Sequence, residues 1–175
     1  MYKLVKVKGV VRIPPEKFGR PLEEVAWEEL RKEYEGVLTT NAGLVVAILD
    51  VKVSEYGKII HGDGATYHDV EFTALTFDPF LKEVVEGEVL NVTESGLFLD
   101  LGPLDGFIYI GQVSDERVEY DASRQALILR GGKKTIERGD VVRARIYNIG
   151  LQPGKGLRIQ LTMRQVGLGK VEEGE

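Results

Sequence analysis

The 175-residue sequence contains no cysteine, only two histidines and no long apolar run. The absence of cysteine excludes disulfide bonds, thiolate zinc sites and cysteine nucleophiles. The longest apolar stretch, residues 43–49, is far shorter than the roughly 18 residues that a membrane span requires. The N-terminal residues alternate between apolar and basic side chains and lack the apolar core of a signal peptide. We therefore expect a cytoplasmic protein without a membrane-spanning segment.

Residues suited to catalysis or metal binding are also scarce. His61, Asp63, His68 and Asp69 form the only cluster of histidine and aspartate, and their spacing is compatible with a metal site or a proton-transfer pair. In an extended chain, however, His68 and Asp69 point to opposite faces. The stretch 150–156 resembles a phosphate-binding loop but lacks the hydroxyl residue that would hold magnesium, which favours a hairpin turn. The sequence predicts no catalytic residue, no metal site and no cofactor.

Charge is unevenly distributed along the chain. The formal net charge is −5, which on its own argues against a nucleic-acid partner. Residues 124–145, however, contain seven basic and two acidic side chains, a local net charge of +5. Because local charge determines which partners a surface attracts, we expect any contact with nucleic acid to be confined to a small region.

The first half of the chain predicts an antiparallel sheet packed against one helix. Pro21 suits the first position of a helix, and apolar residues recur at helical spacing as far as Gly36. Strands are predicted at three places, where apolar residues alternate with polar ones or form β-branched runs: 5–13, 44–53 and 68–77. The segment 55–64, between the last two strands, is typical of a glycine-punctuated loop or an irregular hairpin.

The second half predicts a small barrel. Pro79 cannot donate to a strand ladder, so we place the domain boundary there, with an N-terminal domain at residues 1–80 and a second domain at 81–175. Five short strands are predicted in the second domain: 84–92, 96–101, 106–110, 141–148 and 156–163. An inserted hairpin is expected at 118–120 and 126–130, then a basic turn at 131–134, and the tail after Gly167 should fray. The fold class is α+β, mostly β.

Strand parity in the predicted barrel separates an apolar interior from an aromatic and basic exterior. The inward set is Leu97, Leu99, Leu101, Ile108, Ile110, Val142, Ala144, Ile146, Leu157, Ile159, Leu161 and Met163. The outward set contains Phe98, Phe107, Tyr109, Arg143, Arg145, Tyr147 and Arg158, together with Asp100, Gln160 and Thr162. Exposed rings stack on unpaired bases and arginines contact phosphates, so the outward set predicts binding of single-stranded RNA. The alternative is that these rings pack against the first domain or a protein partner.

Three segments, 84–102, 105–110 and 156–164, resemble the S1 RNA-binding domain, which is an OB-type barrel. The resemblance covers roughly residues 82–166 and implies RNA-facing positions at Ser95, Phe98, Tyr109, Asn148 and Arg158. Phe98 and Arg158 are the residues usual in the family, whereas Ser95 replaces a common aromatic, Tyr109 a histidine and Asn148 an aspartate. Lys133 and Lys134 of the basic turn complete the predicted RNA-binding set.

The whole chain is similar to the E-prime family, the larger of the two stalk subunits in archaeal RNA polymerases. The similarity rests on the opening residues 1–5, on Asn41-Ala-Gly-Leu and on the His61-Gly-Asp-Gly-Ala loop before a strand that ends in Phe77-Asp-Pro-Phe. It implies an RNP-like tip domain followed by the S1 barrel, in a non-catalytic subunit. Its implied partners are the small helical stalk subunit, known as F, in a heterodimer, the polymerase core and single-stranded nascent RNA. The implied roles are in transcription initiation, elongation and termination. We expect the docking loop on the core to contain Gly57, Gly62, Asp63 and Gly64.

Two other functions remain open. A free-standing S1-domain RNA-binding factor in translation or RNA decay would share the barrel but would lack stable attachment to polymerase. A hydrolase that uses His61 and Asp63 would show turnover that disappears in His61→Ala.

Overall fold

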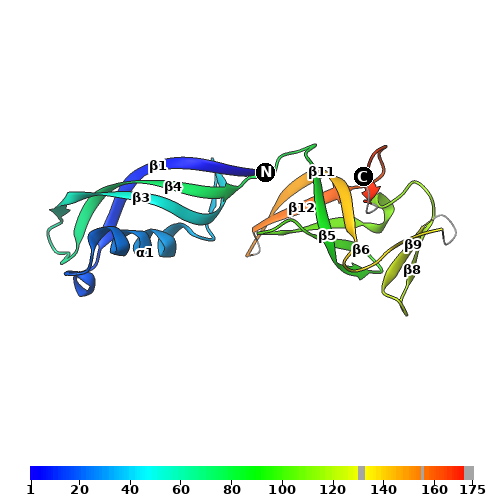
Figure 1. The fold of residues 1–175 in the computed structure, drawn as a ribbon, viewed down its shortest axis with the longest axis horizontal. Helices are drawn as coiled ribbons and strands as arrows, with labels where there is room; N and C mark the ends of the chain where they lie inside the picture. Colours follow the sequence, from blue (N-terminus) through cyan, green and yellow to red (C-terminus); the bar gives the residue numbers. More distant parts are fainter. Residues whose placement is uncertain (130–132, 155, 172–175) are drawn as a thin grey trace. The chain divides into compact units, whose positions relative to one another are not determined.

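The computed structural model describes residues 1–129, 133–154 and 156–171. The chain divides into two compact units, Met1–Pro79 and Phe80–Glu175, both drawn in Figure 1. Strands dominate, and the described residues contain a single α-helix, which confirms the predicted fold class. None of the helices in the described ranges has the length and apolar character needed to cross a membrane.

Unit 1 is a four-stranded antiparallel sheet with the helix across one face (Figure 1). Its elements are β1 (Tyr2–Ile13), the 3-10 turn η1 (Pro15–Lys17), α1 (Leu22–Tyr34), β2 (Leu38–Thr39), β3 (Gly43–Ile59) and β4 (Thr66–Phe77). The strands lie in the order β1-β4-β3-β2. The predicted helix is confirmed: it follows Pro21, carries Glu23 and Glu24 in its first turn, and is followed by Gly36 at a φ of 81°.

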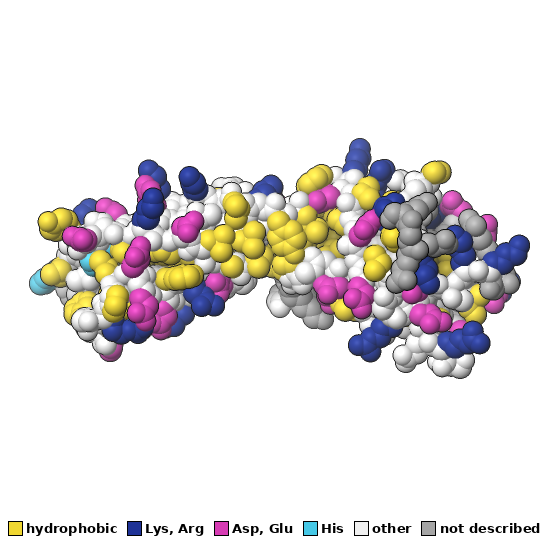
Figure 2. All heavy atoms as spheres, viewed as in Figure 1, with side chains coloured by type: hydrophobic (Ala, Val, Ile, Leu, Met, Phe, Trp, Pro, Cys, Tyr) yellow, Lys and Arg dark blue, Asp and Glu magenta, His cyan; other side chains and the backbone are white. Residues whose placement is uncertain are grey.

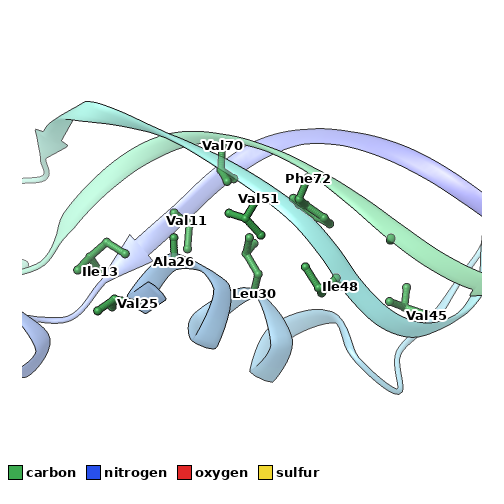
Figure 3. Close-up of a cluster of buried hydrophobic side chains, with 11 residues drawn as sticks. Val11, Ile13, Val25, Ala26, Leu30, Val45, Ile48, Val51, Val70 and Phe72 are labelled. Carbon is green, nitrogen blue, oxygen red and sulfur yellow. The ribbon is translucent and has the colours of Figure 1, made fainter. Parts of the chain in front are cut away.

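The core of unit 1 lies between α1 and the sheet (Figure 3). Val25, Ala26 and Leu30 recur at helical spacing and form the buried face of the helix. They face buried residues of the strands, among them Val11 and Phe72. Burial of this apolar stripe fixes the helix against the sheet.

Strand β3 continues well past the predicted end at residue 53. Three irregularities interrupt its register with β4, and the last of them lies between Val53 and Gly57. After it, pairing resumes as far as Ile59, opposite Thr66. Two alternatives were predicted for residues 55–64, a glycine-punctuated loop and an irregular hairpin, and the structure shows the hairpin. Gly57 therefore lies in a strand instead of a loop.

Unit 2 contains the predicted five-stranded closed barrel. Its strands are β5 (Val84–Thr93), β6 (Gly96–Asp100), β7 (Asp105–Tyr109), β11 (Val141–Gln152) and β12 (Gly156–Thr162). They lie in the order β12-β7-β6-β5-β11, and the pairing of β11 with β12 closes the barrel. The 3-10 turn η2 (Ile110–Gln112) follows β7. This arrangement confirms the predicted S1/OB-type barrel.

The insertion and the tail differ from prediction. The inserted segment forms a three-stranded antiparallel sheet of β8 (Val118–Asp121), β9 (Ala126–Leu129) and β10 (Lys134–Ile136), so it holds one strand more than expected. The tail does not fray directly after Gly167, because β13 (Gly169–Lys170) pairs with β11. Gly131 and Gly132 of the predicted basic turn, and the last four residues of the tail, lie outside the described residues.

Candidate nucleic-acid interface

The barrel interior is apolar, and alternation along its strands places aromatic rings outside. Leu97, Leu99 and Ile108 are fully buried, whereas Phe98 is 37% exposed and Tyr109 is 54% exposed. Most of the twelve side chains predicted to face the barrel interior are buried. Besides Leu97, Leu99 and Ile108, they are Leu101, Val142, Ala144, Ile146, Ile159, Leu161 and Met163.

Three residues depart from the predicted parity. Ile110 is only half-buried because it belongs to η2, where strand alternation has ended. Leu157, near the start of β12, is also half-buried. Thr162, predicted to face outward, is buried, and its hydroxyl hydrogen-bonds to Gln112 Oε1 at 2.9 Å.

The outward rings of β6 and β7 lie in an open groove of about 970 Å³. The rings of Phe98 and Phe107 lie on adjacent strands with centroids 5.0 Å apart and planes inclined by 51°. Tyr109, Arg158 and Ser95 line the same groove. Four of the ten predicted RNA-binding residues are therefore brought together, and with them the Ser95 position of the S1 resemblance. Other lining residues were missed, among them Pro103, Leu104 and Gln152, which lie in turns or at strand ends where strand parity gives no signal.

The three predicted arginines have different electrostatic environments. Arg158 lines the groove and is exposed, with no carboxylate partner among the described residues. Arg143 is paired with Glu86 at 2.7 Å, opposite it on β5. Arg145 is half-buried, and its Nε is buried without a hydrogen-bond partner in the described ranges. Of the three, Arg158 alone lines the groove and is therefore the arginine available to a phosphate there.

The remaining predicted residues lie outside the groove. Tyr147 is exposed at the irregularity between Ile146 and Asn148, where β11 shifts its register with β12. Asn148 is exposed, and its side-chain amide donates to Gln160 Oε1 at 2.7 Å. Lys133 and Lys134 are exposed beside and within β10, in the inserted sheet, and do not line the groove.

The predicted docking loop closes onto the end of β1. Asp63 accepts two hydrogen bonds from the Arg12 guanidinium, at 2.9 and 3.0 Å, one from the Tyr67 hydroxyl and one from the Ala65 N–H. These bonds, led by those from Arg12, hold the pKa of the Asp63 carboxyl well below its usual range. Asp63 therefore fixes the shape of the loop, and its carboxylate is already engaged by partners.

The possible histidine and aspartate cluster does not form a site. His61 and Asp69 are exposed, whereas His68 is buried and hydrogen-bonds to the Ser54 carbonyl and the Thr66 hydroxyl. Within the described part of the chain, no group of three or more potential metal ligands comes together. The large apolar side chains exposed at this hairpin, Tyr56, Ile59 and Ile60, were not in the predicted docking set.

Comparison with known proteins matches both units to family models. Residues 8–64 match the SHS2 domain found in the N terminus of Rpb7p/Rpc25p/MJ0397, and residues 78–152 match the S1 RNA binding domain. The chain is 50% identical over 173 residues to DNA-directed RNA polymerase subunit Rpo7 of Saccharolobus shibatae, covering 98% of this chain and 96% of that protein. The chain belongs to the Rpo7 family. The Rpo7 subunit of Sulfolobus acidocaldarius is 47% identical over 172 residues, 98% of this chain and 94% of that protein.

Family membership decides between the functions that the sequence left open. The chain is a subunit of DNA-directed RNA polymerase with an S1 RNA-binding domain, and by its family role it is a non-catalytic part of that enzyme. A more distant relative, DNA-directed RNA polymerase II subunit rpb7 of Dictyostelium discoideum, is 29% identical over 149 residues, 85% of this chain and 82% of that protein.

Proposed function

We propose that this Rpo7-family chain is the larger stalk subunit of its polymerase and that its barrel groove holds single-stranded nascent RNA. The observation that carries the proposal is the groove itself, in which Phe98, Phe107 and Tyr109 lie together with the exposed Arg158. It would support initiation, elongation and termination by holding the transcript, while the chemistry of polymerisation stays with other subunits.

The groove suits a binding mode that tolerates different sequences. Every base has a π face, so stacking on Phe98, Phe107 or Tyr109 requires no particular base, and each stack contributes about 1–3 kcal/mol. Arg158 supplies a positive charge to a backbone phosphate. Charged side chains of both signs are spread over the surface in Figure 2, so attraction at long range is small and contact with RNA is local.

Docking on the polymerase core is assigned to the β3–β4 hairpin end. Here Tyr56, Ile59 and Ile60 are exposed, at 88%, 78% and 51%, next to the loop that Arg12 and Asp63 hold closed. Large apolar side chains on a fixed loop are typical of a protein interface. We therefore assign the contact itself to these side chains, and a shaping role to Gly62, Asp63 and Gly64.

Pairing with the small helical stalk partner is assigned to the opposite end of unit 1, at the start of β1. Tyr2 and Leu4 are exposed there, and Figure 2 shows hydrophobic side chains gathered at this end of the unit. A helical partner that covered them would bury apolar surface, which favours association.

RNA binding is tested by replacing one groove ring while keeping its apolar character. Phe107→Leu should weaken binding of a labelled single-stranded 10-mer at least about fivefold in fluorescence anisotropy, because about 1 kcal/mol or more of stacking is lost. Tyr120→Leu, in β8 outside the groove, is the matched control. If Phe107→Leu and Tyr120→Leu bind the RNA with equal affinity, the groove is not the RNA-binding site.

Assembly is tested by co-purification from cells that express the tagged chain. Leu4→Glu should lose the small helical stalk partner, whereas Ile59→Asp should keep it and lose the polymerase core. If the wild-type chain captures neither the small stalk partner nor the polymerase core, both assignments are wrong. If both substituted chains still capture both partners, the partners bind elsewhere than at Leu4 and Ile59.

A further inference from the structure

Strand β1 lies at the edge of the unit 1 sheet, and within the described residues no strand pairs with its outer side (Figure 1). The strand is long, with 12 residues from Tyr2 to Ile13 in unbroken register with β4. A long unpaired edge presents a row of free N–H and C=O groups, with which another extended chain can pair. The outer side of β1 is therefore a place where a further strand can be added.

The register shows which backbone groups of β1 face outward. The Asp78 N–H donates to the Met1 carbonyl at 2.7 Å, and these two residues continue the β1–β4 ladder by one position. Because hydrogen-bonded and non-hydrogen-bonded pairs alternate along an antiparallel ladder, the odd-numbered residues of β1 bond to β4. The even-numbered residues, among them Lys6, Lys8 and Val10, therefore direct their N–H and C=O groups to the free edge.

The side chains along this edge are basic on one face of the sheet and apolar on the other. Val7 packs against the core on the helix side, so Lys6 and Lys8 lie on the opposite face, where both are exposed. Lys6 has no ion-pair partner among the described residues, and Lys8 pairs with Glu71 at 2.9 Å in an exposed bridge, which adds little stability. Val5 and Val7 are only half-buried. An added strand would cover these valines and meet two available lysines.

A second copy of the chain does not suit this edge. If two β1 strands paired antiparallel about residue 6, 7 or 8, a lysine of one copy would lie opposite a lysine of the other. Like charges directly opposite each other destabilise a sheet, whereas opposite charges stabilise it. The two lysines therefore oppose pairing of two copies and favour a strand that carries carboxylates at the facing positions.

We propose that the outer edge of β1 binds an acidic, extended segment of a protein partner as an additional strand. Backbone hydrogen bonds to Lys6, Lys8 and Val10 provide affinity, and the side chains that face alternate positions provide specificity. The segment carries two carboxylates separated by one residue, opposite the lysines, and an apolar side chain between them on the Val7 side. This surface goes beyond the proposed RNA binding and does not depend on the barrel groove.

The test adds two synthetic peptides to the isotope-labelled full chain: acetyl-TVTEVETVT-amide and its counterpart with lysine in place of both glutamates. Each sequence reads the same in both directions, so it fits a parallel or an antiparallel strand. Exchange of backbone N–H groups with water is measured by NMR as the peptide concentration rises into the millimolar range. The acidic peptide should slow exchange at Lys6, Lys8 and Val10 and leave Val7, which already bonds to β4, unchanged. It should bind at least about threefold tighter than the lysine peptide, because two opposite-charge pairs replace two like-charge pairs.

Lys6→Glu is the variant that isolates the role of charge. With one glutamate and one lysine at the edge, each peptide makes one favourable and one unfavourable pair, so the two affinities should become equal. Lys52→Glu is the matched control, because Lys52 lies on β3 opposite Glu71, on the same face of the sheet as Lys8 but away from the edge. This control should keep the threefold preference for the acidic peptide within about twofold.

Several results would overturn the inference. If neither peptide slows exchange at the three edge N–H groups, the edge does not accept a strand, and if both slow it equally, charge does not select the partner. Protection of the same groups when the chain alone is concentrated would instead indicate pairing of two copies. Protection by a single-stranded RNA 10-mer but by neither peptide would make the edge a nucleic-acid contact. The first three results leave the proposed RNA binding in the barrel groove untouched.

Discussion

Gly57 provides a sharp test of how the β3–β4 hairpin is held. It lies in β3 opposite His68 of β4, and a Cβ at position 57 would lie 2.6 Å from Nε2, 2.7 Å from Cε1 and 3.0 Å from Cδ2 of the imidazole ring. The ring is 6% exposed, and its nitrogens hydrogen-bond to the Ser54 carbonyl at 2.8 Å and to Thr66 Oγ1 at 3.0 Å. The ring cannot move away from a new methyl group without breaking these bonds.

Gly57→Ala should therefore destabilise unit 1 by about 2–3 kcal/mol. Forcing an extra carbon into a packed site costs about 1–3 kcal/mol, and displacing the ring would leave the Ser54 carbonyl without its partner, at about 1 kcal/mol or more. Backbone strain adds nothing, because Gly57 is not among the residues with positive φ. The whole effect should then depend on the presence of the imidazole.

The assay is urea unfolding followed by the fluorescence of Trp27, the only tryptophan in the sequence, which lies in α1 of unit 1. In a His68→Ala background, Gly57→Ala should cost less than about 0.5 kcal/mol, which gives a coupling energy of about 2 kcal/mol. Gly9→Ala, also in a strand of this unit and with open space at its Cβ, is the control. A small effect in the wild type, or an equal effect in both backgrounds, would refute the steric reasoning.

Three further predictions concern charge and packing. The pKa of Glu28 is lowered to about 2, chiefly by its hydrogen bond from Lys17. The stability that Glu28 contributes is therefore complete above about pH 4.5 and is lost as the pH falls toward 2. Glu28→Gln should reduce the change in the urea midpoint of unfolding between pH 4.5 and 2. Gly96→Ala should destabilise the barrel by about 3 kcal/mol in calorimetry, because Gly96 has a φ of 150° and its Cβ would lie 2.0 Å from the Ile108 carbonyl oxygen. Arg158→Ala should lower the salt slope of RNA binding by about one unit or less, measured by anisotropy between low and high salt.

Much of the fold could be predicted because it depends on periodicity. The helix from Leu22 has an apolar stripe at helical spacing, and the barrel strands alternate so regularly that Leu97 and Leu99 could be placed inside and Phe98 outside. The extension of β3 to Ile59 could not be predicted, because pairing resumes only after the irregularity between Val53 and Gly57, where His68 of β4 hydrogen-bonds to the Ser54 carbonyl. Strand β13 was missed because Gly169 and Lys170 carry no strand signal of their own.

The candidate site was predictable where a side chain's role follows from its own strand. Phe98, Phe107 and Arg158 were placed outward by parity, and the groove contains them. Arg143 also points outward, but its charge is balanced by Glu86, which is 57 residues away in sequence and adjacent only through the β5–β11 pairing. The bond between Asn148 and Gln160 likewise depends on a register shift that no single-strand pattern reveals.

The central claim, that the barrel groove holds nascent RNA, is tested most directly by photo-cross-linking within a transcribing polymerase that contains this chain. The transcript carries photoreactive uridines upstream of the RNA–DNA hybrid, in the part that has left the polymerase. These uridines should cross-link to peptides that contain Phe98, Phe107 or Tyr109, as mapped by mass spectrometry. Phe107→Leu should reduce those cross-links without preventing assembly. Cross-links from the emerging transcript to this chain that consistently avoid the groove would contradict the account.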